Sequence, residues 1–275
     1  MMKRILVFIL IVASVLAQAE PLLAVSKPAK QEKTENLTYD VYFHLGFIWA
    51  KAGRGNLTYY NESLQDGTQL KHGQLAAQSL NVVEHIMRVR DTLDTWMNNQ
   101  MVPTEFIKKT HEGKYNCIEH NIFTPKWKNT AAKLEPKNVA SSEVKVHRWL
   151  QKGKEKPTTD DTLHVVNEPA YDMLSLFYVV RDMNFTTMAR GTKMKYACFS
   201  GLKKDWINVE YKGVENIELR NGKQFSAHLV YLTFATKGQE STPLKVWLSK
   251  TPDHRPLKVI IGLKRIGSVQ CEIVE

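Results

Sequence analysis

Residues 167–184, NEPAYDMLSLFYVVRDMN, carry the one clear helix pattern in a chain that otherwise alternates like successive β-strands. The apolar side chains of this segment cover almost the whole circumference of a helical wheel: Tyr171, Met173, Leu174, Leu176, Phe177, Tyr178, Val179 and Val180. A helix that is apolar nearly all round is a buried helix. In a mostly β chain only a sheet can bury it, so we expect a helix over residues 169–183 with the sheet wrapped around it.

The strands on either side of this helix are marked by alternation with a period of two. Residues 37–45 place four apolar side chains on one side, and residues 47–60 continue as a second strand. Glycines at positions 53 and 55 interrupt this second strand, which predicts a bulge or the close approach of another element. Further alternating segments are residues 69–83, 105–111, 114–123, 192–199, 205–211, 214–219, 225–234, 244–249, 257–262 and 268–273. This pattern predicts a mainly β fold, a single curved antiparallel sheet that forms an open barrel or half-barrel.

Three segments depart from the alternating pattern. Residues 91–97 have apolar spacing compatible with a short helix. Residues 126–161 are so polar that we expect a long solvated excursion, interrupted only by a strand at residues 144–150. Residues 20–35 are rich in Lys, Glu and Pro, so they are expected to form a flexible leader. The ordered part is then one β-rich domain over residues 36–275.

The N-terminus has the composition of a secretory signal peptide. Lys3 and Arg4 precede an apolar run over residues 5–16, and Ala17-Gln18-Ala19 is a small-residue cleavage site. A run of about 12 apolar residues is too short to span a bilayer, and no later segment is long and apolar enough to do so. We therefore expect cleavage near Ala19 and a periplasmic or secreted protein without a transmembrane segment.

The chain is basic. Its formal net charge is +10, and removal of Lys3 and Arg4 leaves 36 basic against 28 acidic residues, a net charge of about +8. A solvated basic surface explains this most simply, and the alternative is attraction to an anionic membrane surface or an acidic glycan. Nucleic acid is excluded as a partner because the lysines are scattered. A lipid, a glycan or an envelope protein is the expected partner, and the sequence predicts no oligomeric state.

Three cysteines remain after cleavage, at Cys117, Cys198 and Cys271, all within expected strands. Their wide spacing matches no zinc pattern. We expect buried thiols that pack as small apolar groups, and the sequence leaves open whether two of them form a disulfide.

No complete catalytic, metal or cofactor pattern is present. The pairs His111-Glu112 and Glu119-His120 lie on an expected hairpin, but neighbours on a strand point to opposite faces, so no metal or cofactor is predicted. Residues 200–203 repeat the Ser-x-x-Lys spacing of penicillin-recognising enzymes. They lie between two strands, where a hairpin turn is expected instead.

The polar residues of the helix segment are the best candidates for a site. In the structural interpretation, Asp172 complements the helix dipole, Ser175 bonds to the backbone and a partly buried Arg181 pairs with a carboxylate. The functional alternative is a ligand-binding set on the wall of a cavity: Asp172, Ser175, Tyr178, Arg181, Trp49 and Trp247.

Three separated motifs give the chain a resemblance to a known family. Residues 37–53 read LTYDVYFHLGFIWAKAG, and residues 246–249 read VWLS before Arg255-Pro256 and a final Gly-Ser-Val strand at residues 267–269. The helix segment carries the Asp-x-Leu-Ser-x-x-Tyr-x-x-Arg motif as Asp172, Leu174, Ser175, Tyr178 and Arg181. From about Leu37 to its end, the chain resembles domain of unknown function 3108, exported proteins of Bacteroides-like bacteria. The resemblance implies a β-rich envelope protein and no particular activity. This chain reads Ser-Lys-Thr-Pro at residues 249–252, where the family often has an acidic residue.

The leading functional hypothesis is non-enzymatic binding of an apolar or amphipathic ligand, or of an envelope partner, in a cavity between sheet and helix. Its basis is an aromatic set expected in the interior: Tyr39, Phe43, Phe47, Trp49, Tyr171, Phe177, Tyr178 and Trp247. One alternative is a hydrolase or transferase that acts on envelope glycans or lipids through Asp172, Arg181 and a histidine. Another alternative is an assembly factor that uses exposed sheet edges.

Overall fold

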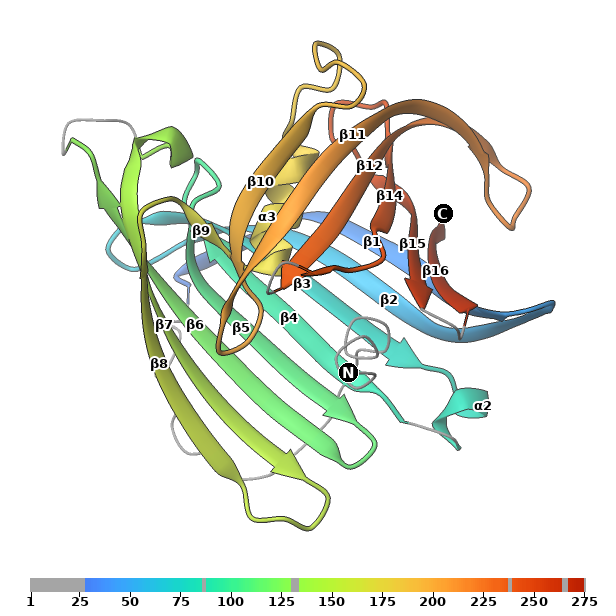
Figure 1. The fold of residues 1–275 in the computed structure, drawn as a ribbon, viewed down its shortest axis with the longest axis horizontal. Helices are drawn as coiled ribbons and strands as arrows, with labels where there is room; N and C mark the ends of the chain where they lie inside the picture. The colour runs from blue at the N-terminus through green and yellow to red at the C-terminus, as the bar shows by residue number, and fades with distance from the viewer. Residues whose placement is uncertain (1–27, 86–87, 130–133, 237–238, 264–266, 275) are drawn as a thin grey trace.

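The computed structural model describes residues 28–85, 88–129, 134–236, 239–263 and 267–274. The expected signal peptide, residues 1–19, lies outside the described residues, as does the first half of the expected leader. The described part is mainly β, as predicted, with one helix longer than four residues (Figure 1). Within these ranges no helix combines the length and the apolar composition that crossing a membrane requires.

Sixteen strands of the described residues form one sheet. From one edge to the other they are β8 (Thr158–Val166), β7 (Val139–Lys152), β6 (Tyr115–Trp127), β5 (Pro103–Glu112), β4 (Arg90–Met97), β3 (Gln69–Ser79), β2 (Ile48–Ser63), β1 (Lys30–Leu45), β16 (Gly267–Val274), β15 (Pro256–Leu263), β14 (Leu244–Ser249), β12 (Gln224–Thr236), β11 (Lys204–Glu218), β10 (Lys193–Phe199) and β9 (Ala170–Tyr171). The short β13 (Gln239–Glu240) pairs with β12 off this path. All pairings are antiparallel except that of β9 with β10, so the sheet is mixed rather than purely antiparallel.

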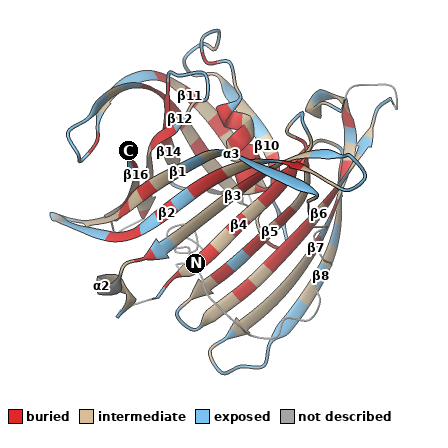
Figure 2. Ribbon diagram, turned by 180° about the vertical axis from the view of Figure 1, so that it is seen from behind, coloured by how far each residue is buried: buried red, intermediate tan, exposed pale blue. Residues whose placement is uncertain are grey.

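The sheet curls until its two edges nearly meet, which gives the predicted open, barrel-like shape (Figures 1 and 2). Side chains bridge the edges where the main chain does not pair. Ser142 Oγ donates to the carbonyl of Glu168 at 2.9 Å, and His164 Nε2 donates to the carbonyl of Leu202 at 3.0 Å. The barrel is therefore nearly closed by hydrogen bonds between its edge strands and the connections that follow them.

Helix α3 (Met173–Arg181) lies on the inner face of the sheet, which we define as the face that carries Leu57, Leu93 and Thr95. The helix contacts β3, β4 and β10. The ring of Tyr178 lies so close to Gly73 that a Cβ at position 73 would be 2.2 Å from Tyr178 Cε2. The sheet thus wraps a buried helix as predicted, although the helix is shorter than residues 169–183 because residues 170–171 form β9.

The β11–β12 hairpin arches over the outer face of the sheet (Figure 1). Val246 packs in the apolar cluster that contains helix residue Val180, so the next residue, Trp247, points to the opposite face of β14. At the hairpin tip the backbone N–H of Arg220 donates to Glu272 Oε2 at 2.7 Å. The β11–β12 hairpin therefore covers Trp247 on the outer face, and the apolar residues around it belong to the same extended cluster as Leu174 and Tyr178 of α3.

Two sequence-based expectations are wrong in the middle of the chain. Residues 91–97 belong to strand β4, because Asp91, Leu93, Thr95 and Met97 are all buried on one face with the alternation of a strand. The polar segment 126–161 is mostly strand as well: β6 continues to Trp127, and β7 and β8 form a long hairpin. Some of its charges lie on strands rather than in loops, where Arg148 pairs with Asp160 and His147 with Asp161 across β7 and β8.

The expected leader is also shorter than residues 20–35. Strand β1 begins at Lys30, and its first residues pair in register with the end of β2, Lys30 opposite Ser63. The glycine prediction for β2 is confirmed: a register shift lies beside Gly53, where a Cβ would be 2.5 Å from the carbonyl oxygen of Gln78. Residues 205–211 and 214–219 join into β11 through a second bulge.

Three smaller expectations concern a turn, the cysteines and the aromatic set. The turn predicted at residues 200–203 separates β10 from β11. Cys117, Cys198 and Cys271 are all free thiols. Phe47, expected in the interior, is 93% exposed at the β1–β2 turn. The aromatic set is thus not a single interior cluster.

Candidate functional site

The polar residues at the start of α3 hold the helix in place. The carboxylate of Asp172 is fully buried and accepts hydrogen bonds from the backbone N–H groups of Leu174 and Ser175 at 2.8 Å, and from Thr95 Oγ1 at 2.8 Å. Ser175 Oγ accepts from the N–H of Asp172 in return, which completes a capping box. Burial raises the pKa of Asp172, and these donors counteract the shift. The geometry is that of the structural interpretation.

Arg181 ties the other end of α3 to the sheet. Its guanidinium forms two hydrogen bonds with Glu35 of β1, at 2.7 and 2.8 Å, and donates to the carbonyls of Asp253 and His254. The hydroxyl of Tyr178 donates to the carbonyl of Thr58 at 3.2 Å. The predicted carboxylate partner of Arg181 therefore lies in the segment that we expected to be a flexible leader.

The structure does not bring the two predicted tryptophans to this helix. Trp247 Nε1 donates to Glu215 Oε2 at 3.1 Å beneath the arched hairpin. Trp49 is 38% exposed near the start of β2, stacked on His44 and beneath the guanidinium of Arg220. Asp172, Ser175, Tyr178 and Arg181 thus share one element, whereas Trp49 and Trp247 lie on β2 and β14, Trp247 in the same extended apolar cluster as Tyr178.

A polar cluster on the outer face of β2–β4 escaped the sequence reasoning. His72 Nδ1 lies 2.7 Å from Glu62 Oε1, and His72 Nε2 lies 3.0 Å from Asp94 Oδ1. The imidazole is stacked on Trp96, whose Nε1 donates to Glu62 Oε2. Burial lowers the pKa of His72, but the bonds to Asp94 and Glu62 prevail and raise it to about 9. This cluster is a closed ion network, and within the described ranges no three such side chains are arranged to hold a metal.

The inner face carries a row of charges across four strands. Lys108 on β5, Glu119 on β6, Arg148 on β7 and Asp160 on β8 are direct cross-strand neighbours. Lys108 Nζ lies 3.1 Å from Glu119 Oε2, and the guanidinium of Arg148 pairs with Asp160. We call these four residues the charge ladder. Its Lys108–Glu119 half is buried, whereas Asp160 is 42% exposed near the sheet edge.

Side-chain oxygens without a hydrogen-bond partner accompany this ladder. Among the described residues, five buried side-chain oxygens have none: Asp40 Oδ1, Asp91 Oδ2, Glu112 Oε1, Asn121 Oδ1 and Thr162 Oγ1. Four of the five lie on the inner face of β4, β5, β6 and β8 beside the ladder. An unsatisfied buried polar group costs about 1–3 kcal/mol, so their concentration on one wall requires a physical reason.

Two carboxyls of this wall have perturbed acidities. Burial raises the pKa of Asp91 to about 7, a shift that the N–H of His111 reduces and the charge of Glu112 increases. Burial also raises the pKa of Glu112 to about 7, against the opposing charge of Lys108. Perturbed carboxyls of this kind gather at functional sites, and also in structural ion networks. We call Asp91, Glu112, Asn121, Thr162 and the charge ladder together the polar wall.

Comparison with known protein families shows which family the chain belongs to. The sequence model of DUF3108, described as a protein of unknown function, matches residues 38–274. The chain belongs to the DUF3108 family. The resemblance seen in the three motifs is therefore confirmed, and the family description assigns no activity.

Comparison with solved structures places this DUF3108 chain beside one other uncharacterised fold. It is similar to a β-barrel-like protein of domain of unknown function DUF1849 from Brucella abortus, with a TM-score of 0.44 and 10% sequence identity. The match covers 87% of this chain and 95% of that one. No curated protein matches the sequence.

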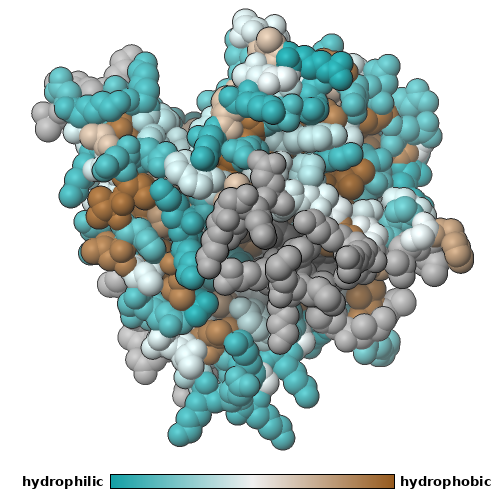
Figure 3. All heavy atoms as spheres, in the orientation of Figure 1, coloured by the Kyte–Doolittle hydropathy of each residue, from teal (hydrophilic) through white to brown (hydrophobic). Residues whose placement is uncertain are grey.

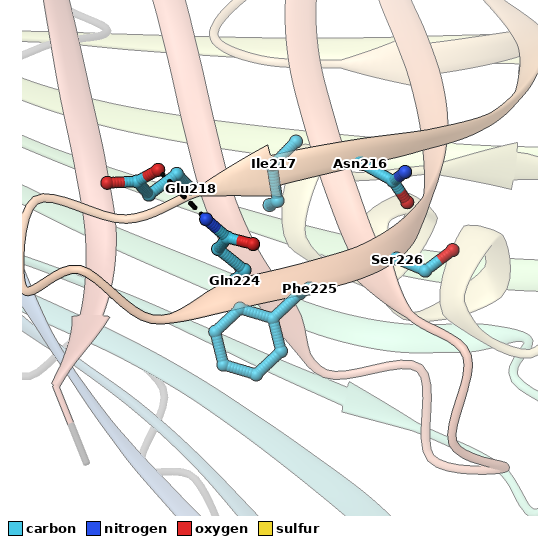
Figure 4. A pocket seen from close by; sticks show the side chains of 6 residues that line it. All are labelled: Asn216, Ile217, Glu218, Gln224, Phe225 and Ser226. Atoms are coloured by element: carbon cyan, nitrogen blue, oxygen red, sulfur yellow. Dashed lines mark hydrogen bonds between the residues drawn. The ribbon is translucent and has the colours of Figure 1, made fainter.

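A pocket also occurs at the tip of the arched hairpin of this DUF3108 chain (Figure 4). Its lining comes from the two ends of that hairpin: Asn216, Ile217, Glu218, Gln224, Phe225 and Ser226. Gln224 Nε2 donates to Glu218 Oε2 at 3.2 Å across it. None of the predicted site residues and none of the polar wall lines this pocket, so we do not assign it a function.

The polar wall has a signal in the sequence that alternation alone can reveal. Residues 117, 119, 121 and 123 face the same side, yet they read Cys, Glu, Asn and Phe. The same happens on β7, where Arg148 follows Val144 and Val146 on the inner face. A charged residue at an inward position of an otherwise apolar series marks the wall in the sequence of this DUF3108 protein.

Proposed function

We propose that this DUF3108 protein is a non-enzymatic binding protein that holds an amphipathic ligand against the inner face of β4–β8. The observation that carries the proposal is the concentration of partnerless buried oxygens on the polar wall. A ligand that donates hydrogen bonds there would satisfy groups that are otherwise costly to bury. The site differs from the expected cavity between sheet and helix, because the Asp172 carboxylate and the Tyr178 ring are fully occupied in packing α3.

The apolar part of the ligand has a matching surface directly above the charge ladder. The next rows of the same strands, toward α3, carry buried apolar side chains, with Phe106 and Val146 beside Asn121 and then Phe123 opposite Val144. Along β4, Asp91 is four residues from Thr95, the partner of the helix cap, a separation of about 13 Å at the rise of a strand. The inner face therefore changes from polar to apolar over the length of a short lipid chain.

The face of the molecule drawn in Figure 3 offers less to an apolar ligand. On the face shown in Figure 3, hydrophilic residues dominate where described residues are visible, and apolar ones form small separate patches. Isolated apolar patches are ordinary on soluble surfaces. The envelope location predicted from residues 1–19 forms part of the proposal.

Native mass spectrometry of the protein, released from an expressing host in mild detergent, tests this function. Thr162 faces the inner side of β8 and Leu163 faces outward, 58% exposed, so they offer a matched pair of substitutions. The wild type and Leu163→Trp are expected to retain a bound amphiphile, whereas Thr162→Trp fills the site and loses most of it. Bare protein in all three, with no thermal shift from lipids or glycans, would count against the proposal.

The hydrolase alternative gains no support from the geometry. Its proposed acid, Asp172, is fully buried and already accepts three hydrogen bonds. Arg181 is likewise committed to Glu35 and two carbonyls. We therefore propose binding alone as the function.

A further inference from the structure

We propose that the polar end of the ligand is a cationic amine, bound by Asp91 and Glu112 on the polar wall. This inference rests on the proposed function, and it specifies the class of ligand. It is carried by the position, burial and charge of two carboxylates that the rest of the fold leaves partly unpaired.

The local backbone brings the two carboxylates together. Strands β4 and β5 pair regularly from Thr92 opposite Lys109, and the ladder ends in an isolated bridge between Val89 and Glu112. Asp91 lies between these two pairings, where one of its oxygens accepts the N–H of His111. The register is unchanged between these two pairings, so Thr110 lies opposite Asp91, and Glu112 lies diagonally across from Asp91 on the same inner face.

One oxygen of Asp91 has a structural purpose, and the other does not. Oδ1 accepts the backbone N–H of His111 where the pairing of β4 with β5 is interrupted, which accounts for an acidic or amide side chain at this position. Oδ2 of this fully buried residue and Oε1 of Glu112 accept no hydrogen bond of normal geometry among the described residues, although the hydroxyl of Thr110 lies close enough to Asp91 to lower its pKa. Two neighbouring acceptors without donors match a group that carries several N–H donors, as a primary ammonium does.

The charge of the wall has the sign that a cation requires. Burial raises the pKa of Asp91 and of Glu112 to about 7, so both carry their charge above that pH. There the four acidic groups, Asp91, Glu112, Glu119 and Asp160, face two basic groups, Lys108 and Arg148, a formal balance of −2. Lys108 is the nearest internal cation, but Glu119 holds its ammonium at 3.1 Å. An anionic head group would meet repulsion from the two unpaired carboxylates, and a neutral one would leave their charge unbalanced.

A series of amphiphiles with one chain length tests the head group. Dodecylamine, dodecanol and dodecanoate are titrated into the full-length protein below their aggregation concentrations, and affinities are measured by calorimetry. Dodecylamine is expected to bind at least tenfold more tightly than dodecanol, and dodecanoate more weakly than both. Asp91→Asn and Glu112→Gln each reduce dodecylamine affinity at least tenfold and reduce dodecanol affinity much less.

Asp161→Asn is the matched control, because Asp161 lies on the outer face of β8 and its side chain is 78% exposed. Circular dichroism establishes that each variant folds, and either single variant suffices for the conclusion. Equal binding of all three amphiphiles, with no effect of Asp91→Asn, overturns the cationic assignment and leaves the proposed function intact. If none of the three amphiphiles binds, the result contradicts the proposed function and this inference with it.

Discussion

Gly73 shows how one residue sets the position of the helix. Its missing side chain is the space that the ring of Tyr178 occupies, since a Cβ there would lie 2.2 Å from Cε2. Its φ is not in the left-handed region, so the requirement for glycine comes from packing and not from backbone strain. The contact explains why β3 can approach the helix closely at this point.

We predict that Gly73→Ala destabilises the fold by about 1–3 kcal/mol through overpacking, measured by urea unfolding. Gly55→Ala is the matched control, because its Cβ would have 3.4 Å to its nearest neighbour. The further change Tyr178→Leu should remove part of the clash and restore some of the loss in the double variant. Equal stabilities of the Gly73→Ala and Gly55→Ala variants would contradict this account.

Asp91 gives the protein a stability that depends on pH. Its folded-state pKa of about 7 exceeds its value in the unfolded chain, so the protonated folded form is favoured, and stability is lost as pH rises through that pKa. Each pKa unit corresponds to about 1.4 kcal/mol. The shift from 3.8 to about 7 is about three units, so we predict that Asp91→Asn is more stable than the wild type by up to about 4 kcal/mol at pH 8 and by much less at pH 4.

Thermal unfolding at both pH values measures this difference. Asp161→Asn again serves as the control, and its stability should follow that of the wild type at each pH. If the stability difference between the wild type and Asp91→Asn is the same at pH 4 and at pH 8, the pKa of Asp91 is not raised.

Strand β1 is the element whose extent matters most for α3. Its first six residues, KQEKTE at positions 30–35, have the composition of a linker. They nevertheless pair with β2, and Glu35 binds Arg181. Composition could not reveal this, because the polar side chains of a strand at the edge of the core are the same as those of a leader. The partner is fixed only by the register of β1 on β2.

We predict that Glu35→Gln destabilises the protein by about 3 kcal/mol, because it leaves the buried guanidinium of Arg181 without a counter-charge. Glu32→Gln, at an exposed position on the same strand, is the control and should change stability by less than about 0.5 kcal/mol. Equilibrium unfolding in urea compares the two variants. Similar small losses in both would show that the ion pair does not anchor α3.

Element by element, the sequence patterns predicted most of the strands because one face of each is buried. They failed where inward positions are polar: Asp91 and Thr95 made β4 resemble a helix, and the charges of β7 and β8 made a hairpin resemble a loop. The same inward charges form the polar wall. Two of the errors in secondary structure therefore occur at the candidate site, where local pattern and core packing disagree.

For the whole molecule, alternation and the apolar helix predicted a curved sheet around α3, and the three motifs predicted the DUF3108 family. Alternation could not predict which inner positions meet across strands, because the ladder depends on the registers of four strand pairs. Nor could it place Trp247 under the arched hairpin, on the opposite face from α3. The ligand-binding role of the residues on α3 stays a prediction, and the proposed site lies further along the same inner face.

The central claim is that the inner face of β4–β8 holds an amphiphile with its polar end at Asp91 and its chain toward α3. A crystal structure with 12-bromododecylamine, analysed at the bromine absorption edge, tests it most directly. The account predicts an anomalous peak among the apolar rows near Phe106 and Val146, with the amine at Asp91. A peak only on the outer face, or no ordered bromine in crystals grown at saturating amphiphile, would contradict it.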